Sequence, residues 1–333
     1  MKKFIIITTI NKKTEAIIKF SKKLKDWNII LVGDKKSKNI KNEKNILFLS
    51  LKDQKNLGFE TFNKCPYNHY TRKNLGYLYA IKNGADIIYD TDDDNLPYNN
   101  WSFPDFKIKI DLFSNKKSFI NIYNLFTKEK IWPRGYPINR IKEKNKWTQT
   151  RKNIKIGVWQ GLADIEPDVD SLYRLIIGKK IKFKKRNPLA LDKETYCPFN
   201  SQNTLWNKEF FYYLYLPSTV SFRFTDILRG YITQKLLWLE NYYLGFTNAS
   251  VYQKRNEHDL MKDFYDEISV FVNVENIIKL FSIIKFKNKN NKAENIKKIY
   301  NCLYQEGFVK KEEIIRLNAW LYDIKKIESE FKN

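Results

Sequence analysis

The sequence predicts an α/β fold built around a mostly parallel sheet. Short apolar segments alternate with segments of helical spacing over the first hundred residues, and strands joined by helices form parallel sheets. Polar residues follow directly on three of the apolar segments, as expected where parallel strands end at a binding crevice. With 333 residues, 43% of them hydrophobic, the chain can also bury a large core.

Local patterns predict each element of the first hundred residues. Helical spacing at 14–25 and 68–85 predicts two helices, and Gly84 is typical of the residue that ends a helix. The predicted strands are apolar runs at residues 3–10, 27–34, 45–51 and 86–90.

The remainder of the chain is less regular. Residues 167–178 and 224–246 have patterns typical of helices. From Asp259 on, the chain is helical and lysine-rich, and it closes with an amphipathic helix at 311–331.

Composition and charge exclude several classes of protein. The apolar runs are far too short to span a membrane, and the opening "MKKFIIITTINKK" lacks the length and cleavage site of a signal peptide. Three scattered cysteines indicate neither a disulfide framework nor a zinc site, so a reducing cytoplasmic compartment fits best. The net charge of +24 comes from scattered lysines, which indicates a solvated surface that would also hold the protein against the anionic inner face of a plasma membrane. No nucleic-acid-binding motif is present, so we expect no nucleic-acid partner.

The segment "ADIIYDTDDDNLP", residues 85–97, places four aspartates behind a predicted buried strand. Asp90, Asp92, Asp93 and Asp94 would repel one another unless a cation or a proton offset their charge. Mg²⁺ and Mn²⁺ prefer carboxylate oxygens, usually together with water and substrate phosphates. The alternative is an acidic turn before Pro97, but the position at a strand end favours a metal site.

Cations and histidines near this cluster are further candidates. Arg72 and Lys73 lie near the start of the helix that leads into the aspartate strand, where they would either face a diphosphate or be ordinary surface charges. His69 would cap that helix or contact phosphate, and His258, in a polar segment, would complete a metal shell.

Three later polar segments mix hydrogen-bonding side chains with aromatic residues, which suits sugar recognition. They are "WQGLADIEPDVD", "CPFNSQNTLW" and "VSFRFTDILRGY". Asp164, Asp168 and Asp226 are candidates for a general base, and spacing does not choose between them.

Eight motifs in a fixed order resemble the STELLO-type glycosyltransferase family, which includes soluble bacterial enzymes and lumenal domains of plant Golgi proteins. They are "TTIN", "VGDKK", "LSLKDQ", "NHYTRKNLGYLYAI", "IYDTDDDN", "GLADIEPDVD", "PFNSQNT" and "RFTDILRGYI", and they span about residues 3–260. The family is distantly similar to the reversibly glycosylated polypeptides, which handle UDP-sugars through a DDD motif.

The resemblance implies a GT-A fold with a Rossmann-like nucleotide-binding sheet and helices on both of its faces. The expected glycosyltransferase domain covers 1–258, with a nucleotide half at about 1–100 and an acceptor half at about 101–258. A C-terminal helical extension at 259–333 would follow.

By the same resemblance, Thr9 and Asn11 would border the nucleotide, and Asp34 would approach its base or ribose. Arg72 and Lys73 would face the diphosphate.

The resemblance also implies a divalent-metal site for Mn²⁺ or Mg²⁺. Asp92 and Asp94 would be the DXD-type pair, and Asp93 between them would support ribose or metal. Many GT-A enzymes use a histidine near the end of the domain as a metal ligand, and His258 is the candidate by analogy.

For the chemistry, Asp226 is the first choice as base or acceptor-orienting carboxylate, followed by Asp168 and Asp170. We expect transfer of a sugar from a nucleotide-sugar donor, a UDP-sugar in the first place, to a glycan or lipid-linked acceptor in bacterial surface polysaccharide synthesis. The alternatives are a UDP-sugar pyranose/furanose mutase, which needs no acceptor, and a basic protein that binds polyanions.

Overall fold

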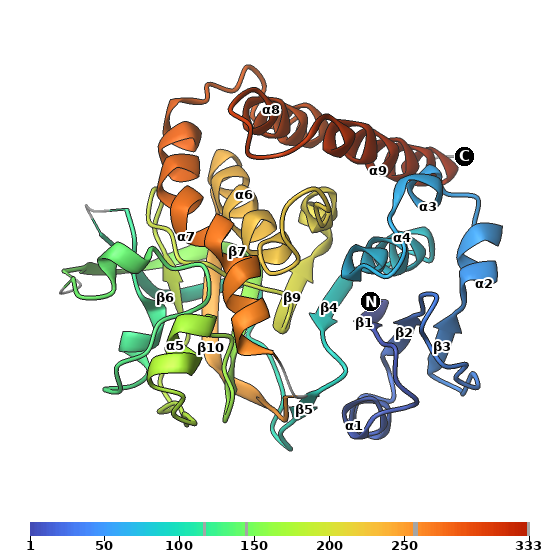
Figure 1. The fold of residues 1–333 in the computed structure, drawn as a ribbon, viewed down its shortest axis with the longest axis horizontal. Coiled ribbons are helices and arrows are strands. Elements are labelled where there is room, and N and C mark those ends of the chain that lie inside the picture. The colour runs from blue at the N-terminus through green and yellow to red at the C-terminus, as the bar shows by residue number, and fades with distance from the viewer. Residues whose placement is uncertain (116–117, 144–145, 256–258, 332–333) are drawn as a thin grey trace.

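One mixed sheet organises the structure, a computed structural model that describes residues 1–115, 118–143, 146–255 and 259–331. Its ten strands in the described residues run in the order β3-β2-β1-β4-β9-β7-β6-β8-β10-β5, and β7 also pairs with β10 (Figure 1).

The elements have the following bounds. The strands are β1 (Lys3–Thr8), β2 (Asn28–Val32), β3 (Ile46–Leu49), β4 (Ile87–Thr91), β5 (Asn95–Pro97), β6 (Lys107–Ser114), β7 (Thr148–Asp164), β8 (Leu189–Leu191), β9 (Asn203–Asn207) and β10 (Tyr242–Gln253). The α-helices are α1 (Glu15–Lys23), α2 (Leu51–Asn56), α3 (Glu60–Lys64), α4 (Lys73–Lys82), α5 (Ser171–Ile176), α6 (Thr225–Leu239), α7 (Leu260–Ile283), α8 (Lys292–Gln305) and α9 (Lys311–Glu330). The 3-10 helices are η1 (Tyr70–Arg72), η2 (Ile122–Leu125), η3 (Ile138–Arg140) and η4 (Lys208–Leu214).

The α/β class predicted from the sequence is confirmed. The four predicted strands form the parallel set β3-β2-β1-β4, the order of a Rossmann-like half sheet. The expectation of a mostly parallel sheet holds only for this half, because β9 enters antiparallel beside β4. The second half is mixed, because β6–β8 and β7–β10 pair in parallel whereas its other pairs are antiparallel.

Helices cover both faces of the parallel half, because its strands alternate between two apolar faces. Ile6 and Ile30 belong to the core on the side of α4, whereas Ile5 and Ile29 belong to the core that includes residues of α1. Gly76 lets α4 approach closely, since a Cβ there would lie 2.7 Å from Ile6 Cγ2.

Two predicted helices are shorter than expected. The pattern at 68–85 becomes η1 followed by α4, with Gly84 in the left-handed region (φ +75°) just beyond the helix end. The pattern at 224–246 is helical only to Leu239, because the chain turns at Asn241 (φ +57°) and continues as strand β10.

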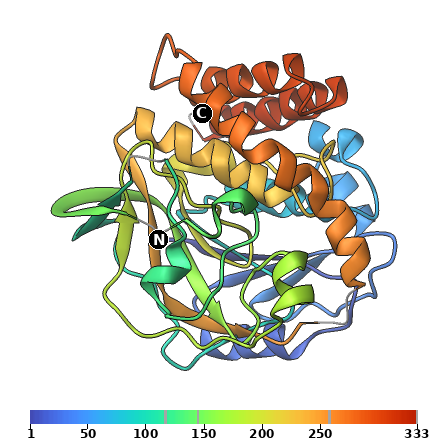
Figure 2. The ribbon, with the colours of Figure 1, turned by 60° about the vertical axis from the view of Figure 1, so that its left-hand side comes forward.

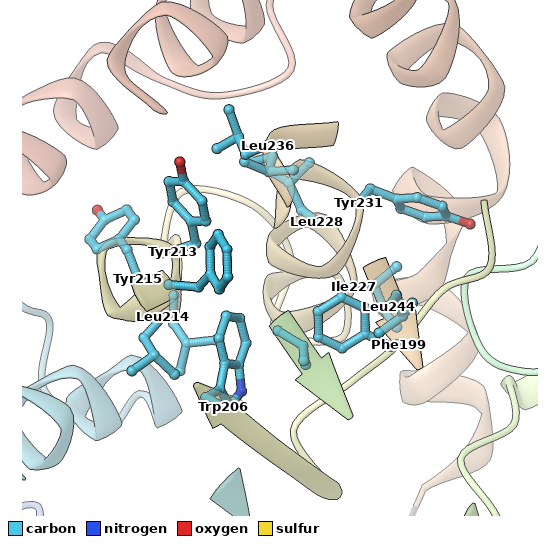
Figure 3. Close-up of a cluster of buried hydrophobic side chains, with 14 of the residues drawn as sticks. Phe199, Trp206, Tyr213, Leu214, Tyr215, Ile227, Leu228, Tyr231, Leu236 and Leu244 are labelled. Carbon is cyan, nitrogen blue, oxygen red and sulfur yellow. The ribbon is translucent and has the colours of Figure 1, made fainter. Parts of the chain in front are cut away.

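The second half has an aromatic core between η4, α6 and the sheet. Figure 3 shows part of it, in which Trp206 of β9 lies near Leu214 of η4, and α6 contributes Ile227 and Leu228. These side chains are at most 1% exposed, so α6 is fixed firmly over the sheet.

The C-terminal helical region packs on the rest of the chain. Helices α8 and α9 lie across one side of the molecule, and α9 reaches α3 and α4 of the nucleotide half (Figures 1 and 2). No helix among the described residues is long and apolar enough to cross a membrane.

Helix α9 caps α3 at both of its ends. Asp323 accepts hydrogen bonds from the backbone N–H groups of Glu60 (2.9 Å) and Thr61 (2.8 Å), which α3 leaves without a cap of its own. At the other end, Arg316 Nε donates to the carbonyl of Lys64 (3.1 Å).

Replacing Asp323 with alanine should lower the free energy of unfolding by about 1–3 kcal/mol, because Thr61 N–H loses its acceptor in a buried place. Urea unfolding followed by circular dichroism measures this loss. The control is Glu330→Ala at the exposed end of the same helix, which should change stability by less than about 0.5 kcal/mol. Equal losses in the two variants would contradict the capping role.

Candidate functional site

Two adjoining pockets lie at the carboxyl ends of the parallel strands. The aspartate pocket, with a cavity of about 290 Å³, contains Asp92, Asp93 and Asp94. The strand-end pocket, of about 470 Å³, is lined by the loops that follow β1 and β2. The two pockets share the lining residues Thr8, Tyr70, Asp93 and Phe222. The aspartate pocket is further lined by Arg134, Asp168, Ser201, Gln202, Arg223, Asp226, Gln253 and Arg255, and the strand-end pocket by Thr9, Asn11, Asp34, His69 and Arg72, among others.

Asp93 ties the strand ends together. Its Oδ2 accepts hydrogen bonds from Thr9 Oγ1 (2.5 Å) and Asn11 Nδ2 (3.1 Å), and its carbonyl accepts one from Thr14 Oγ1 (2.6 Å). Asp34 lines the same pocket from the end of β2. The predicted convergence of three polar strand ends on one edge of the sheet is therefore confirmed.

Asp92 and Asp94 face the aspartate pocket with little compensating charge. Asp92 Oδ1 lies 3.3 Å from Lys73 Nζ, and Asp94 Oδ2 accepts a hydrogen bond from Gln253 Nε2 (2.9 Å). Partial burial of Asp92, whose side chain is 39% exposed, together with the nearby carboxylates of Asp94 and Asp90, raises its pKa to about 7 despite Lys73. Burial likewise raises the pKa of Asp94. A pair of carboxylates that resists ionisation fits a place for a cation.

The donor set suits a metal that takes part of its shell from substrate. No group of three His, Cys, Asp or Glu side chains that could hold a metal ion occurs in the part of the chain that the structure describes. Asp92 and Asp94 would therefore be completed by phosphate oxygens and water, as is usual for Mg²⁺. The predicted ligand His258 lies outside the described residues.

Lys73 points into the protein and not into the pocket. Its Nζ lies 2.6 Å from Asp90 Oδ1, donates to the carbonyl of Thr91 (2.7 Å), and is fully buried. Burial acts to lower the pKa of Lys73, but the carboxylates of Asp90 and Asp92 outweigh it, so the pKa is raised. Arg229 binds the other oxygen of Asp90 at 3.0 Å, so this fourth aspartate of the cluster is enclosed between two cations.

Arg72 is also buried but borders the strand-end pocket. Its guanidinium donates to Gln54 Oε1 (2.5 and 3.1 Å) and to the carbonyl of Cys65, and it lies 5.0 Å from the ring centroid of Tyr67. His69, in the same pocket, accepts a hydrogen bond at Nδ1 from Thr71 N–H, which is the helix cap predicted for it. Burial, with Arg316 nearby, lowers the pKa of His69 to about 4 and keeps its ring neutral.

The sequence analysis did not predict Arg134 as a residue of the site. This arginine binds both oxygens of Asp168 at 2.8 Å and reaches Asp226 at 2.9 Å, and all three side chains are less than 10% exposed. Burial of Asp168 is outweighed by Arg134, which holds the pKa of Asp168 below its usual range. The signal was a lone arginine between proline and glycine in "WPRGYP", too short a pattern to interpret.

The four candidates for the base thus occupy three different places. Asp168 and Asp226 line the aspartate pocket, and both bind Arg134. Asp170 instead caps α5 by accepting a hydrogen bond from Tyr173 N–H (2.8 Å), and it accepts another from Trp132 Nε1 (2.6 Å). Its role is therefore structural. Burial raises its pKa to about 6. Asp164, also named as a candidate, binds Tyr98 Oη (2.9 Å) and Phe183 N–H (2.9 Å) outside this pocket.

Further residues of the aspartate pocket come from β10 and from the loop before α6. Gln253 Oε1 accepts hydrogen bonds from Gln202 Nε2 (2.7 Å) and from Arg255 (2.9 Å). Arg223 binds Glu267 of α7 at 2.8 Å. The C-terminal region therefore orients a pocket residue, although the sequence predicts it as an extension.

Comparison with known proteins confirms the resemblance predicted from the sequence. The model of the STELLO glycosyltransferases matches residues 223–333. Two Arabidopsis thaliana proteins, the probable glycosyltransferases STELLO1 and STELLO2, are 28% and 29% identical over 97% of this chain. The chain spans 44% of the length of each of these curated relatives.

The similarity extends further than expected. It includes the helices after residue 260, which the sequence motifs did not cover. A solved structure, that of S. aureus TarS 1–349 in complex with UDP-GlcNAc, aligns with 99% of this chain and 83% of its own at 14% identity and a TM-score of 0.37.

Proposed function

We propose that this chain is a glycosyltransferase of the GT-A type that takes its sugar from a nucleoside diphosphate sugar, a UDP-sugar in the first place. The observation that carries the proposal is the junction of the two pockets at Asp93, beyond the carboxyl ends of parallel strands. A nucleoside fits the strand-end pocket, where Asp34 offers a carboxylate to a ribose or base. The diphosphate and sugar would then extend into the aspartate pocket. The similarity to proteins named glycosyltransferases supports this assignment.

Asp92 and Asp94 would hold Mn²⁺ or Mg²⁺ together with the diphosphate. When bound, such an ion supplies Lewis-acid stabilisation of the charge that develops on the leaving phosphate. Lys73, held by Asp90, keeps Asp92 aimed at the pocket. Gln253 does the same for Asp94.

In the transfer, the bond from the anomeric carbon to the diphosphate breaks, a bond to an acceptor oxygen forms, and the acceptor hydroxyl passes its proton to an oxygen of the leaving diphosphate or to water. Arg134 holds the pKa of Asp168 below its usual range, which makes this carboxylate a weak proton acceptor, and Arg134 also binds Asp226. Their geometry supports the acceptor-orienting role, in which they accept hydrogen bonds from sugar hydroxyls.

The proposal extends to a glycan or lipid-linked acceptor in bacterial surface polysaccharide synthesis. A net charge of +24 supports an enzyme that works against the anionic inner face of a plasma membrane.

A thermal-shift experiment tests the donor site. UDP with Mn²⁺, at about 100 times its Kd, should stabilise the protein by about 2.7 kcal/mol and raise Tm by several degrees. UDP without metal should do much less, because the aspartates repel the diphosphate. Asp94→Ala should remove the metal-dependent shift, whereas Asp105→Ala, an exposed aspartate that lines neither pocket, should keep it. If no nucleotide shifts Tm with or without metal, the proposal fails.

A further inference from the structure

A third cavity lies on the other side of one wall of the aspartate pocket. This basic pocket, of about 300 Å³, is lined by Arg174, Lys179, Lys180 and Arg255, with Glu166 as its acidic residue. Arg255 lines both cavities, so the basic pocket and the aspartate pocket adjoin.

The wall between them is the loop that follows β7. Asp168 turns its side chain into the aspartate pocket, while its neighbours Pro167 and Val169 line the basic pocket. Glu166 fixes the loop to the end of β10, because its Oε2 accepts a hydrogen bond from Arg255 N–H (2.8 Å). Only a single backbone segment would therefore separate a ligand in the basic pocket from the carboxylate of Asp168.

The positive charge of the basic pocket is only partly compensated. Arg174 pairs with Asp263 (3.0 Å) and Lys179 with Glu129 (2.8 Å). Arg255 has a neutral partner, Gln253, and no described carboxylate lies within ion-pair distance of its guanidinium.

The arginines around this pocket also repel one another. Burial, together with the charges of Arg255 and Arg223, lowers the pKa of Arg174 to about 10. Burial lowers the pKa of Arg255 as well. The charges of Asp168 and Asp94 act against this effect, whereas Arg223 and Arg134 add to it. An anion in the basic pocket would relieve this repulsion.

We propose that the basic pocket is an acceptor subsite that binds a phosphate group of the acceptor. Bound there by Arg255 and Lys180, a phosphate-bearing acceptor would extend over the loop at Asp168 and present a hydroxyl to the sugar in the aspartate pocket. Guanidinium groups bind phosphate oxygens in pairs, which suits a phosphomonoester or a phosphodiester. The inference rests on the proposed function, because it assigns the aspartate pocket to the donor.

The test measures inorganic phosphate binding by thermal shift, with UDP and Mg²⁺ present at saturation and at constant ionic strength. With the donor site filled, the remaining shift reports a second phosphate site. Arg255→Gln and Lys180→Gln should each weaken phosphate binding roughly tenfold, since each removes a charge-assisted hydrogen bond. Lys182→Gln, an exposed lysine two residues beyond Lys180 that does not line the pocket, should leave it unchanged.

A second arm shows where the phosphate comes from. Sedimentation with phosphatidylcholine vesicles that contain phosphatidic acid, against pure phosphatidylcholine, tests a lipid phosphate. Retention that is lost in Lys180→Gln but not in Lys182→Gln would support the subsite and place the phosphate on a lipid. A phosphate shift with no such retention would support a soluble phosphorylated acceptor.

The inference is overturned if phosphate does not raise Tm and if each of the three variants sediments equally with vesicles that contain phosphatidic acid and with pure phosphatidylcholine vesicles. The UDP shift with Mg²⁺ is measured in the same samples. Its absence would refute the proposed donor site, whereas its presence without a phosphate effect would refute the acceptor subsite alone.

Discussion

Replacing Arg134 with alanine should lower the free energy of unfolding by about 3–5 kcal/mol, one of the two largest effects that we expect. Asp168 and Asp226 would be left as buried carboxylates without their cation, which costs more than the ion pairs themselves contribute. The measurement is urea unfolding, followed by circular dichroism at neutral pH.

Two further variants separate lost charge balance from lost packing. Adding Asp168→Asn and Asp226→Asn to Arg134→Ala should recover part of the loss, because the carboxylates are then neutral. Lys208→Ala, which removes a more exposed ion pair with Asp86, should cost less than about 1 kcal/mol. If Arg134→Ala also cost less than about 1 kcal/mol, the arginine would not be what stabilises the buried cluster.

Asp94→Ala should reduce catalysis at least about 10²-fold while leaving the fold intact. The variant removes one of the two pocket carboxylates proposed to hold the metal, so charge on the leaving diphosphate would go unstabilised. UDP release, measured with the UDP-sugar that gives the largest thermal shift, tests this without knowledge of the acceptor.

The metal-free stability of the same variant is the control for folding. Because burial raises the pKa of Asp94, its carboxylate is unfavourable in the empty pocket, and Tm without metal should not fall. Asp105→Ala should match the wild type in both measurements. Undiminished UDP release by Asp94→Ala would refute its role.

The sequence predicts the parallel half and its polar edge well, because both depend on local patterns. Apolar runs of strand length ended in Thr9, Asp34 and the aspartate cluster, and parallel strands bring such ends together. The orientation of Lys73 could not be predicted in this way. Helix α4 is buried on almost every side, so periodicity does not show which face meets the pocket.

The positions of residues that depend on tertiary contacts could not be predicted from the sequence. Arg134 lies in a loop, and its partners are 34 and 92 residues away. Arg255 follows strand β10, whose first residues the sequence predicted as part of a helix. No local pattern therefore predicted that Arg255 would lie in the same pocket as Asp168. The predicted domain boundary at residue 258 likewise gave no indication that Glu267 of α7 would bind Arg223 in the pocket.

The contact of α9 with α3 also constrains how the chain can be made. Asp323 caps a helix that emerges from the ribosome 263 residues earlier. The nucleotide half therefore cannot reach its final state before α9 has been synthesised, although domains usually fold from the N-terminus as they emerge. Until α9 arrives, Phe59 and Phe62, which lie in the same apolar core as Trp320 and Ile324 of α9, lack part of their cover. Nascent chains of this protein should thus depend on chaperones until α9 has been synthesised, and variants that omit α9 should aggregate instead of forming a folded nucleotide half.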